Sequence, residues 1–508
     1  MTDNQPRTSF DIRFVWAVCA AIFIIYVLFP TKNYYYDGIT FAQTIEDATS
    51  LNTSLIHPNH LIYELVGYFF YHLLRLINTN IRAVTALQIL NSILAACAVY
   101  FFIRISLRSF GRLYIGLCLG LFLAFSSTWW KFATDADAYI PSVLFLLISF
   151  YLILPGRELR PFLVAVMFSI AMCFHELAIM FGPVAVLGLY FQTQERTRGE
   201  QLSVLCRFAL LGLALTLGAY FLGFHKATGS FDLLRFARWL TSFSPDADVS
   251  FNLAQAAKYT ARGNIRLLFG GRLTLLKGLM NPFVWFVVFL LALTVIGLIV
   301  QLVRTRGTLT AARIRALRAN AAQWQLFLLC VTWAISFLVF LFFWLPQNTF
   351  YRLFYLPALL LLVGLVVKAL GGEPHYRLAL FTATLSLSNF LFLTLPYSYE
   401  VSFPPLAFSR EMSKVWPAGA IVYYGTVNSD ESLFRYFNPH TTWKLMKADQ
   451  LDAVERDMAS NPDVWMDATG IEQLTATPKG AEWLAQHHEE EHELKNPLFN
   501  LRFVHLRP

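Results

Sequence analysis

Residues 161–191 read PFLVAVMFSIAMCFHELAIMFGPVAVLGLYF, an apolar stretch that contains no Arg, Lys or Asp and only one His and one Glu, His175 and Glu176. It is either one long helix with a polar break or two short membrane spans joined by a turn. Loop charge separates these alternatives, because Arg and Lys gather in cytoplasmic loops. Two spans keep the arginine-rich loops before residue 161 and after residue 191 on one side, whereas one span separates them. We therefore predict two antiparallel spans that turn at His175.

Apolar segments extend over most of the chain. Hydrophobic residues make up 56% of the 508 residues and charged residues 14%, with a mean hydropathy of +0.51, whereas a soluble domain carries about 25% charge. A run of about 20 apolar residues can cross a bilayer. Such runs lie near 14–29, 81–103, 113–128, 139–154, 161–174, 176–191, 208–224, 283–303, 324–345, 353–370 and 378–395. The expected fold class is an α-helical polytopic membrane protein with about 11 transmembrane helices.

The net charge of +8 does not indicate a nucleic-acid partner. Many of the Arg and Lys residues lie in short loops between apolar runs, where the positive-inside rule accounts for them. We expect an integral, multi-pass protein of a bacterial inner (plasma) membrane with a cytoplasmic N-terminus. The six cysteines all lie in or beside apolar runs, which predicts neither a disulfide framework nor a zinc site.

Two long loops, about 31–80 and 225–282, fall on the extracytoplasmic side by the parity of the spans. Within the second, residues 231–243 (FDLLRFARWLTSF) have apolar positions at helical spacing with arginines between them. A helix of that kind lies in the membrane interface.

Residues 399–508 differ in character from the transmembrane domain, 1–398, because charge rises and apolar runs shorten. Strands are predicted at 420–424, 464–466 and 501–506, and helices at 449–460 and 479–488, which indicates a small extracytoplasmic α/β domain. The run HHEEEHE at 487–493 is either a metal site or a solvated helix end, and we expect the helix end.

Asp37 follows the first apolar run directly, in YYYDG. A carboxylate at the boundary of lipid and water can have a pKa raised toward the working range of a general base. The alternative is an N-cap, because Asp37 precedes a plausible interfacial helix.

Asp135 and Asp137 form a DxD pattern after two interfacial tryptophans, in WWKFATDADAY. Their carboxylates could hold a divalent cation, Mg²⁺ or Mn²⁺. The alternative is a solvated turn that caps the next span.

His175 and Arg352 lie at the ends of apolar runs. An ionisable residue at membrane depth is often functional, although His175 could equally mark a tight outside turn. Arg352, in NTFYRLFYLP, suits a phosphate that it would bind through two hydrogen bonds, or else extends to the lipid headgroups. No P-loop, GxGxxG or GxSxG motif signals a nucleotide cofactor.

The motifs, in the order in which they occur along the chain, resemble those of the GT-C superfamily of membrane glycosyltransferases. Within that superfamily they are most similar to those of the protein O-mannosyltransferase-like branch. The likeness rests on Asp37 after the first span and on the four stretches HPNHLIYELVGYFFYHLLRL (57–76), SSTWWKFATDADAY (126–139), FSIAMCFHELAIMFGP (168–183) and NTFYRLFYLP (348–357). His57-Pro58 is followed by Asn59-His60 rather than by Pro-Gly, which leaves the branch and the acceptor open.

The resemblance implies a hexosyl or pentosyl donor on a polyprenyl phosphate and an acceptor hydroxyl of a glycan, lipid or protein on the extracytoplasmic face. Asp37 would take the proton of that hydroxyl, and the sugar would be transferred with inversion. Arg352 would bind the lipid phosphate. His57, His60, Asp135, Asp137 and His175 would bind substrate or, for the two aspartates, a cation. A transporter or flippase of lipid-linked or small polar substrates is the alternative, although no paired halves are visible.

Overall fold

The computed structural model describes two compact units. The described residues are 9–242, 252–271, 276, 279–304, 311–370, 375–400, 403, 406–407, 409–410, 413–425, 429–447, 450–496 and 499–507. The first unit comprises Met1–Pro30 with Thr44–Leu395, and the second comprises Thr31–Gln43 with Pro396–Pro508. The predicted domains, 1–398 and 399–508, have other limits than these two units, and they remain a prediction.

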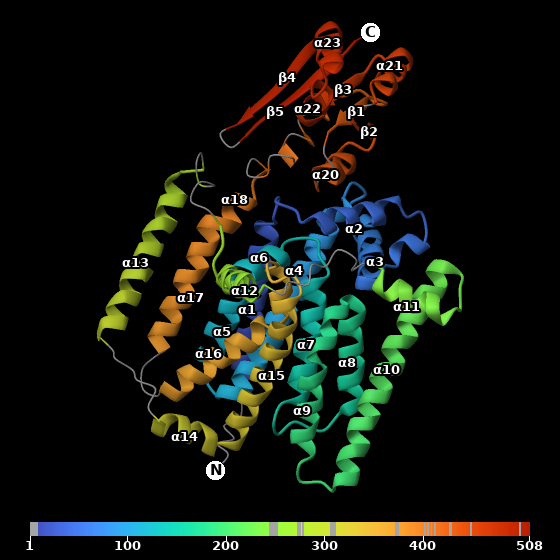
Figure 1. The fold of residues 1–508 in the computed structure, drawn as a ribbon. Coiled ribbons are helices and arrows are strands. Elements are labelled where there is room, and N and C mark those ends of the chain that lie inside the picture. The colour runs from blue at the N-terminus through green and yellow to red at the C-terminus, as the bar shows by residue number, and fades with distance from the viewer. Residues whose placement is uncertain are drawn as a thin grey trace. The chain divides into compact units, whose positions relative to one another are not determined.

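The first unit is helical (Figure 1). Its described elements are α1 (Ser9–Leu28), η1 (Thr53–Leu55), η2 (Pro58–His60), α3 (Tyr63–Arg75), α4 (Ala83–Phe110), α5 (Leu113–Phe125), α6 (Ser127–Ala133), α7 (Tyr139–Ile153), α8 (Pro161–Phe174), η3 (Glu176–Phe181), α9 (Gly182–Thr193), α10 (Arg198–Thr228), α11 (Leu233–Thr241), α12 (Leu253–Leu268), α13 (Pro282–Arg304), α14 (Ala311–Ala319), α15 (Ala321–Phe343), η5 (Phe350–Phe354), α16 (Leu356–Leu370), α17 (His375–Asn389) and the π-helical segment η6 (Phe390–Thr394). Two helices cross the unit boundary, α2 (Tyr36–Asp47) and α18 (Leu395–Tyr397).

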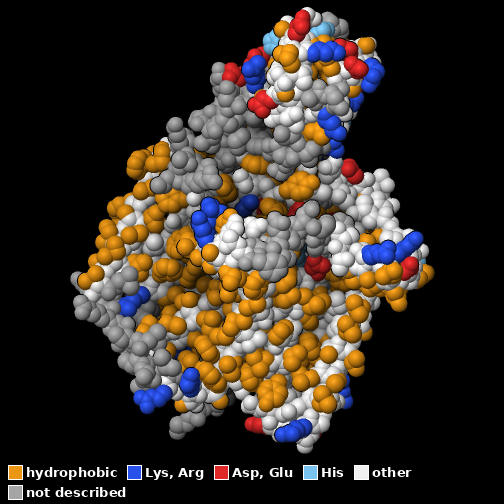
Figure 2. All heavy atoms as spheres, viewed as in Figure 1, with side chains coloured by type: hydrophobic (Ala, Val, Ile, Leu, Met, Phe, Trp, Pro, Cys, Tyr) orange, Lys and Arg blue, Asp and Glu red, His pale blue; other side chains and the backbone are white. Residues whose placement is uncertain are grey.

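The chain is an integral multi-pass membrane protein. Among the described residues, six helices are long and apolar enough to cross a membrane, or seven if α5 and α6, bent by 68°, form one span. Shorter apolar helices lie at Ile12–Leu28, Tyr139–Ile153, Pro161–Phe174 and Leu356–Leu370. Large hydrophobic side chains are exposed along α10 and α13, as expected of lipid-facing helices (Figure 2). The expected fold class is confirmed, while the number of 11 spans stays a prediction.

The turn predicted at His175 is present. Near the end of α9, Gln192 Nε2 donates to the carbonyls of Leu152 and Leu154, at 2.9 and 3.3 Å, at the end of α7, from which a short loop leads to the start of α8 at Pro161. The end of α9 therefore lies beside the start of α8, so these two helices run in opposite directions.

Helix α10 is much longer than the apolar run at 208–224, because capping signals set its ends. Thr197 Oγ1 accepts from the Glu200 N–H, and the Glu200 carboxylate accepts from the Thr197 N–H at 3.0 Å, a capping box. The helix ends at Gly229, which adopts the left-handed conformation (φ 68°) that favours glycine. Helix α11 follows, within the predicted 231–243, and none of its residues is buried, consistent with an interfacial helix. Phe243 lies outside the described residues.

The C-terminal part of the second unit contains a five-stranded sheet. Its strands are β1 (Ile421–Tyr424), β2 (Thr442–Leu445), β3 (Val464–Asp467), β4 (His488–Asn496) and β5 (Phe499–Leu506), in the order β2-β1-β3-β5-β4. Strand β1 pairs in parallel with β2 and β3, and β5 is antiparallel to β3 and β4. The helices are α20 (Ser429–Phe437), α21 (Leu451–Ser460), α22 (Ala468–Thr475) and α23 (Pro478–His487).

Strand β1 is buried on both faces of the sheet, which explains its continuous apolar run. Ile421 and Tyr423 face a core with residues of α21 and α22, while Val422 and Tyr424 face a cluster of aromatic side chains that includes Trp443. The predicted small α/β domain is confirmed in its fold class. Asp449, the first residue of the predicted helix 449–460, lies outside the described residues.

Two details of this unit differ from expectation. Residues 488–493 of the run HHEEEHE form strand β4 rather than a solvated helix end, and only His487 belongs to α23. The charged Glu side chains of this run suit an edge strand, where charge discourages pairing with strands of other molecules. Strand β2 was not expected, because four residues of mixed polarity (TWKL) carry little periodic signal.

Close helix packing gives a testable prediction for Gly120 of α5. A Cβ at this position would lie 2.3 Å from Ile103 Cγ1 of α4, whereas a Cβ on exposed Gly218 of α10 would meet nothing within 4 Å. We expect Gly120→Ala to reduce the free energy of unfolding by about 1–3 kcal/mol. Gly218→Ala should leave it unchanged or raise it by about 0.5–1 kcal/mol. Thermal unfolding in detergent measures both, and equal midpoints would contradict the α4–α5 packing.

Candidate functional site

Histidine and aromatic side chains from separate helix breaks of the first unit form a cluster. His57 and His60 come from η2, His175 from the break after α8, Tyr139 from the start of α7 and Tyr351 from η5. The His175 ring centroid lies 4.8 Å from that of His60, 5.1 Å from Tyr139 and 5.7 Å from Tyr351, and His57 lies 5.7 Å from His60. Three predicted site residues are thereby brought together, although His175 is more than 100 positions from His57 and His60 in the chain.

His175 is oriented by a hydrogen bond at the N-terminus of η3. Its Nδ1 accepts from the Leu177 N–H at 3.1 Å, so the neutral ring carries its proton on Nε2. The side chain is only 3% exposed, and among the described residues Nε2 has no hydrogen-bond partner. A buried donor without a partner is costly unless a ligand satisfies it. The turn at His175 thus carries a buried imidazole ring rather than a solvated one.

Burial keeps these histidines neutral. It lowers the pKa of His57 to about 4 and of His175 to about 3, and burial together with the neighbouring His175 and His57 also lowers the pKa of His60. All three lie outside the spanning helices, and at neutral pH they are hydrogen-bonding groups rather than cations.

These lowered pKa values predict a loss of stability in acid. Between pH 6.5 and 4 the unfolded His57 binds a proton that the folded His57 does not, so stability falls as pH falls. One histidine changes the free energy of unfolding by at most about 1.4 kcal/mol per pH unit. Thermal unfolding measured from pH 7.5 to 4.5 should depend less on pH in His57→Asn than in the wild type. Exposed His440→Asn is the matched control, and parallel curves for His57→Asn and the wild type would refute the burial effect.

Asp135 and Asp137 are fully buried, so the alternative interpretation of a solvated turn is wrong. Each side chain accepts from the next backbone N–H, of Ala136 at 2.9 Å and of Ala138 at 2.7 Å. Their backbone carbonyls accept from the amide of Asn91 in α4, at 2.8 and 2.7 Å. The two aspartates thus shape the loop between α6 and α7.

A metal role for this loop has no further support. Among the described residues, no group of three or more His, Cys, Asp and Glu side chains is placed to hold a metal ion. The expectation of a bound Mg²⁺ or Mn²⁺ stays a prediction.

Arg352 is a fully buried cation of the first unit. Its side chain is 0% exposed, Nη1 donates to Tyr355 Oη at 2.8 Å, and Nη2 donates to the Pro346 carbonyl at 2.7 Å. Nε has no partner, and Arg352 forms no ion pair with any residue that the structure describes. On the other side, the backbone of α12 packs against it, since a Cβ on Gly263 would lie 2.3 Å from Nε. A buried guanidinium without a carboxylate is complementary to an anionic ligand.

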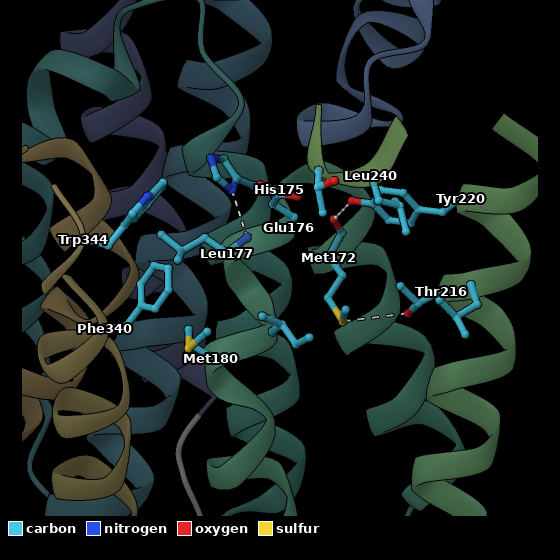
Figure 3. A pocket seen from close by; sticks show the side chains of 13 residues that line it. Met172, His175, Glu176, Leu177, Met180, Thr216, Tyr220, Leu240, Phe340 and Trp344 are labelled. Carbon is cyan, nitrogen blue, oxygen red and sulfur yellow. Dashed lines mark hydrogen bonds between the residues drawn. The ribbon is translucent and has the colours of Figure 1, made fainter. Parts of the chain in front are cut away.

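An apolar cavity of about 480 Å³ adjoins His175 (Figure 3). Its walls come from α8, η3, α10, α11 and α15, and Trp344 on its wall stacks on Tyr351 with ring centroids 5.2 Å apart. Glu176 is the one carboxylate among its lining residues. Tyr220 Oη donates to the Met172 carbonyl at 2.9 Å and so satisfies backbone at the end of α8. A cavity of this composition suits a hydrocarbon chain with a polar group at the histidine end.

Asp37 belongs to the second unit, in the segment Thr31–Gln43. It lies in the first turn of α2 rather than at its N-cap, and its side chain is partly exposed. Glu46, in the same helix but in the first unit, pairs with Arg82 at 2.9 Å and accepts from the Ala83 N–H at 2.7 Å. Glu46 therefore has a structural role at the start of α4. The role of Asp37 as a base stays a prediction.

Sequence reasoning missed the polar residues that support the loop before α7. Gln88, Asn91 and Ser92 lie on one face of α4 and donate to the carbonyls of Thr134, Asp135, Asp137 and Ala133. The available signal was their spacing, since polar residues three and four positions apart share one face of a helix. Such a face inside an apolar run indicates non-helical backbone beside it.

Comparison with known proteins identifies the fold. No protein-family model matches the sequence, and no curated protein is similar to it in sequence. ArnT from Cupriavidus metallidurans bound to undecaprenyl phosphate is similar in structure, with a TM-score of 0.59, 11% identity and 97% of each chain covered. Its apo state aligns with a TM-score of 0.58, 11% identity and the same coverage. The Archaeoglobus fulgidus oligosaccharyltransferase in complex with Zn and sulfate is less similar, with a TM-score of 0.48, 12% identity, and 97% of this chain and 73% of that chain covered.

The likeness to ArnT extends over nearly the whole chain, and at 11% identity it concerns the fold. The resemblance to the GT-C superfamily that the sequence motifs indicated is confirmed at that level, and this chain has the fold of the GT-C membrane glycosyltransferases.

Proposed function

We propose that this protein is a membrane glycosyltransferase that moves a hexose or pentose from a polyprenyl phosphate to an acceptor hydroxyl of a glycan, lipid or protein. The reaction takes place at the extracytoplasmic face of a bacterial inner membrane and inverts the anomeric centre. The acceptor hydroxyl loses its proton to Asp37, its oxygen bonds to the sugar carbon, and the bond from that carbon to the lipid phosphate breaks.

The buried guanidinium of Arg352 is the observation that carries this proposal. It has no ion pair within the part of the chain that the structure describes, and burying an unpaired cation is unfavourable. A phosphate would compensate the charge and, as the leaving group, would gain negative charge as the sugar bond breaks. Stabilising that charge lowers the barrier for transfer.

The cavity beside His175 supports a lipid donor. Met172, Leu177, Met180 and Phe340 line it with apolar surface that a prenyl chain would fill. His175 Nε2–H is a buried donor at this cavity that a phosphate or sugar oxygen would satisfy. ArnT, which shares the fold, binds undecaprenyl phosphate in its crystal structure, and that ligand has the same chemistry.

The decisive variant for catalysis is Asp37→Asn. Purified protein in lipid is incubated with radiolabelled polyprenyl-phosphate sugars, alone and with membrane extract as acceptor. We expect the wild type to release label from the lipid or transfer it, and Asp37→Asn to be slower by about 10² or more, as loss of a general base costs. Asp47→Asn removes an exposed acid of the same helix and should keep full activity.

Transfer by Asp37→Asn at the wild-type rate would exclude Asp37 as the base. If no sugar is released or transferred by the wild type, the same lipids are assayed in sealed vesicles. Movement of the intact lipid between leaflets would then replace the proposed transferase with a flippase.

A further inference from the structure

Helix α12 carries three cations on one face (Figure 1). Lys258, Arg262 and Arg266 follow one another at intervals of four residues, so their side chains lie one turn apart along the same side of the helix. All three are exposed, and none forms an ion pair with a residue that the structure describes. The sequence of α12 contains no acidic residue. These three residues are called the basic face of α12.

Water and the positive-inside rule do not account for the basic face. Like charges four residues apart repel each other, so Arg262 destabilises α12 together with each of its two neighbours on this face. The helix also lies in the loop 225–282, which the parity of the spans predicts to be extracytoplasmic, whereas Arg and Lys gather on the cytoplasmic side. An anionic partner would compensate the repulsion between the three cations.

The opposite side of α12 packs against the ends of apolar helices. Gly263 lies against the Arg352 side chain, and Asn264 Oδ1 accepts from Tyr355 Oη at 2.7 Å. Both partners lie in the link between α15 and α16. That link joins the ends of two apolar helices, Ala321–Phe343 and Leu356–Leu370. Lipid headgroups begin where apolar helices end, so α12 lies at the level of the headgroups.

Exposed apolar side chains flank the basic face. Ile265 lies three residues after Arg262, and Phe269 lies three residues after Arg266, and both are exposed. A helix that presents Lys and Arg beside exposed apolar residues is suited to an anionic lipid surface, because the apolar side chains enter the headgroup region and the cations meet phosphates. A soluble acidic polymer would use the cations but leave Ile265 and Phe269 in water. The composition of this surface therefore favours lipid.

We propose that α12 docks through its basic face on the headgroups of anionic phospholipids at the extracytoplasmic surface of the membrane. The three cations bind lipid phosphates, and the two apolar side chains enter the headgroup region. Asn264 of the same helix accepts from Tyr355, which in turn accepts from Arg352 Nη1. Docked lipid therefore also holds α12 in place beside Arg352.

Hydrogen–deuterium exchange of the α12 backbone tests this docking, because it measures how often one helix opens in the intact protein. The full-length protein is placed in nanodiscs of phosphatidylcholine alone or of phosphatidylcholine mixed with phosphatidylglycerol. We expect phosphatidylglycerol to slow exchange in α12 of the wild type by about fivefold or more, the effect of one cation at an anionic surface. Salt near 1 M, where the Debye length is about 3 Å, should remove most of this protection.

The variant Lys258→Gln/Arg262→Gln/Arg266→Gln should exchange in α12 at the same rate in both kinds of nanodisc, because it has lost the basic face. Its matched control, Lys447→Gln/Arg456→Gln/Lys479→Gln, removes three exposed cations of the second unit and should keep the protection. The two variants lose the same net charge, so a difference between them is specific to α12.

Equal exchange of wild-type α12 in the two kinds of nanodisc would overturn the docking, as would undiminished protection in the α12 variant. Protection by soluble polyphosphate in uncharged nanodiscs, without protection by phosphatidylglycerol, would assign the basic face to an acidic polymer and would also overturn it. If the α12 variant does not fold, the salt dependence of the wild type decides, because salt screens the attraction of cations to phosphates but not apolar contacts. Protection that persists near 1 M salt would then contradict binding through the three cations.

Discussion

Backbone groups that leave a helix inside a membrane protein must find hydrogen-bond partners, because lipid provides none. The helices of the first unit break before α7, after α8 and before α16, and each break leaves carbonyls without a helical partner. Polar side chains of neighbouring spans satisfy them: Asn91 bonds the carbonyls of Asp135 and Asp137, Tyr220 that of Met172, and Trp333 that of Phe354. The proposed active site exists where these supported breaks meet.

The breaks also explain why ionisable residues are buried together. His175 is in extended conformation after α8, Arg352 lies in η5, and His57 caps the short helix η2, which contains His60. None of these segments is a regular α-helix, so their side chains and backbone groups can point into a shared space. Burial keeps the histidines neutral, and buried Arg352 forms no ion pair with a carboxylate among the described residues. The combination is suited to a ligand with an anionic group and polar hydroxyls.

Hydropathy was sufficient to predict the apolar helices, because a run of about 20 apolar residues is a strong signal. Loop charge correctly predicted that the chain turns at His175. The motifs around His57, His175 and Arg352 identified residues of interest but not their mutual contacts, because contacts between distant loops depend on tertiary packing. Asp135 and Asp137 show this limit, since the hydrogen bonds from Asn91 that hold their backbone come from a residue 44 and 46 positions earlier in the chain. Strand β4 shows another, because a charged run has no apolar periodicity to reveal an edge strand.

Binding of the lipid phosphate by Arg352 is the central claim of this account, and equilibrium binding of undecaprenyl phosphate to the purified protein tests it most directly. The variants are Arg352→Gln, Arg352→Lys and the exposed-residue control Arg75→Gln. Loss of a charge-assisted hydrogen bond predicts an affinity lower by about tenfold or more in Arg352→Gln, with partial recovery in Arg352→Lys and none of this loss in Arg75→Gln. Equal affinity in the wild type and Arg352→Gln would contradict the account.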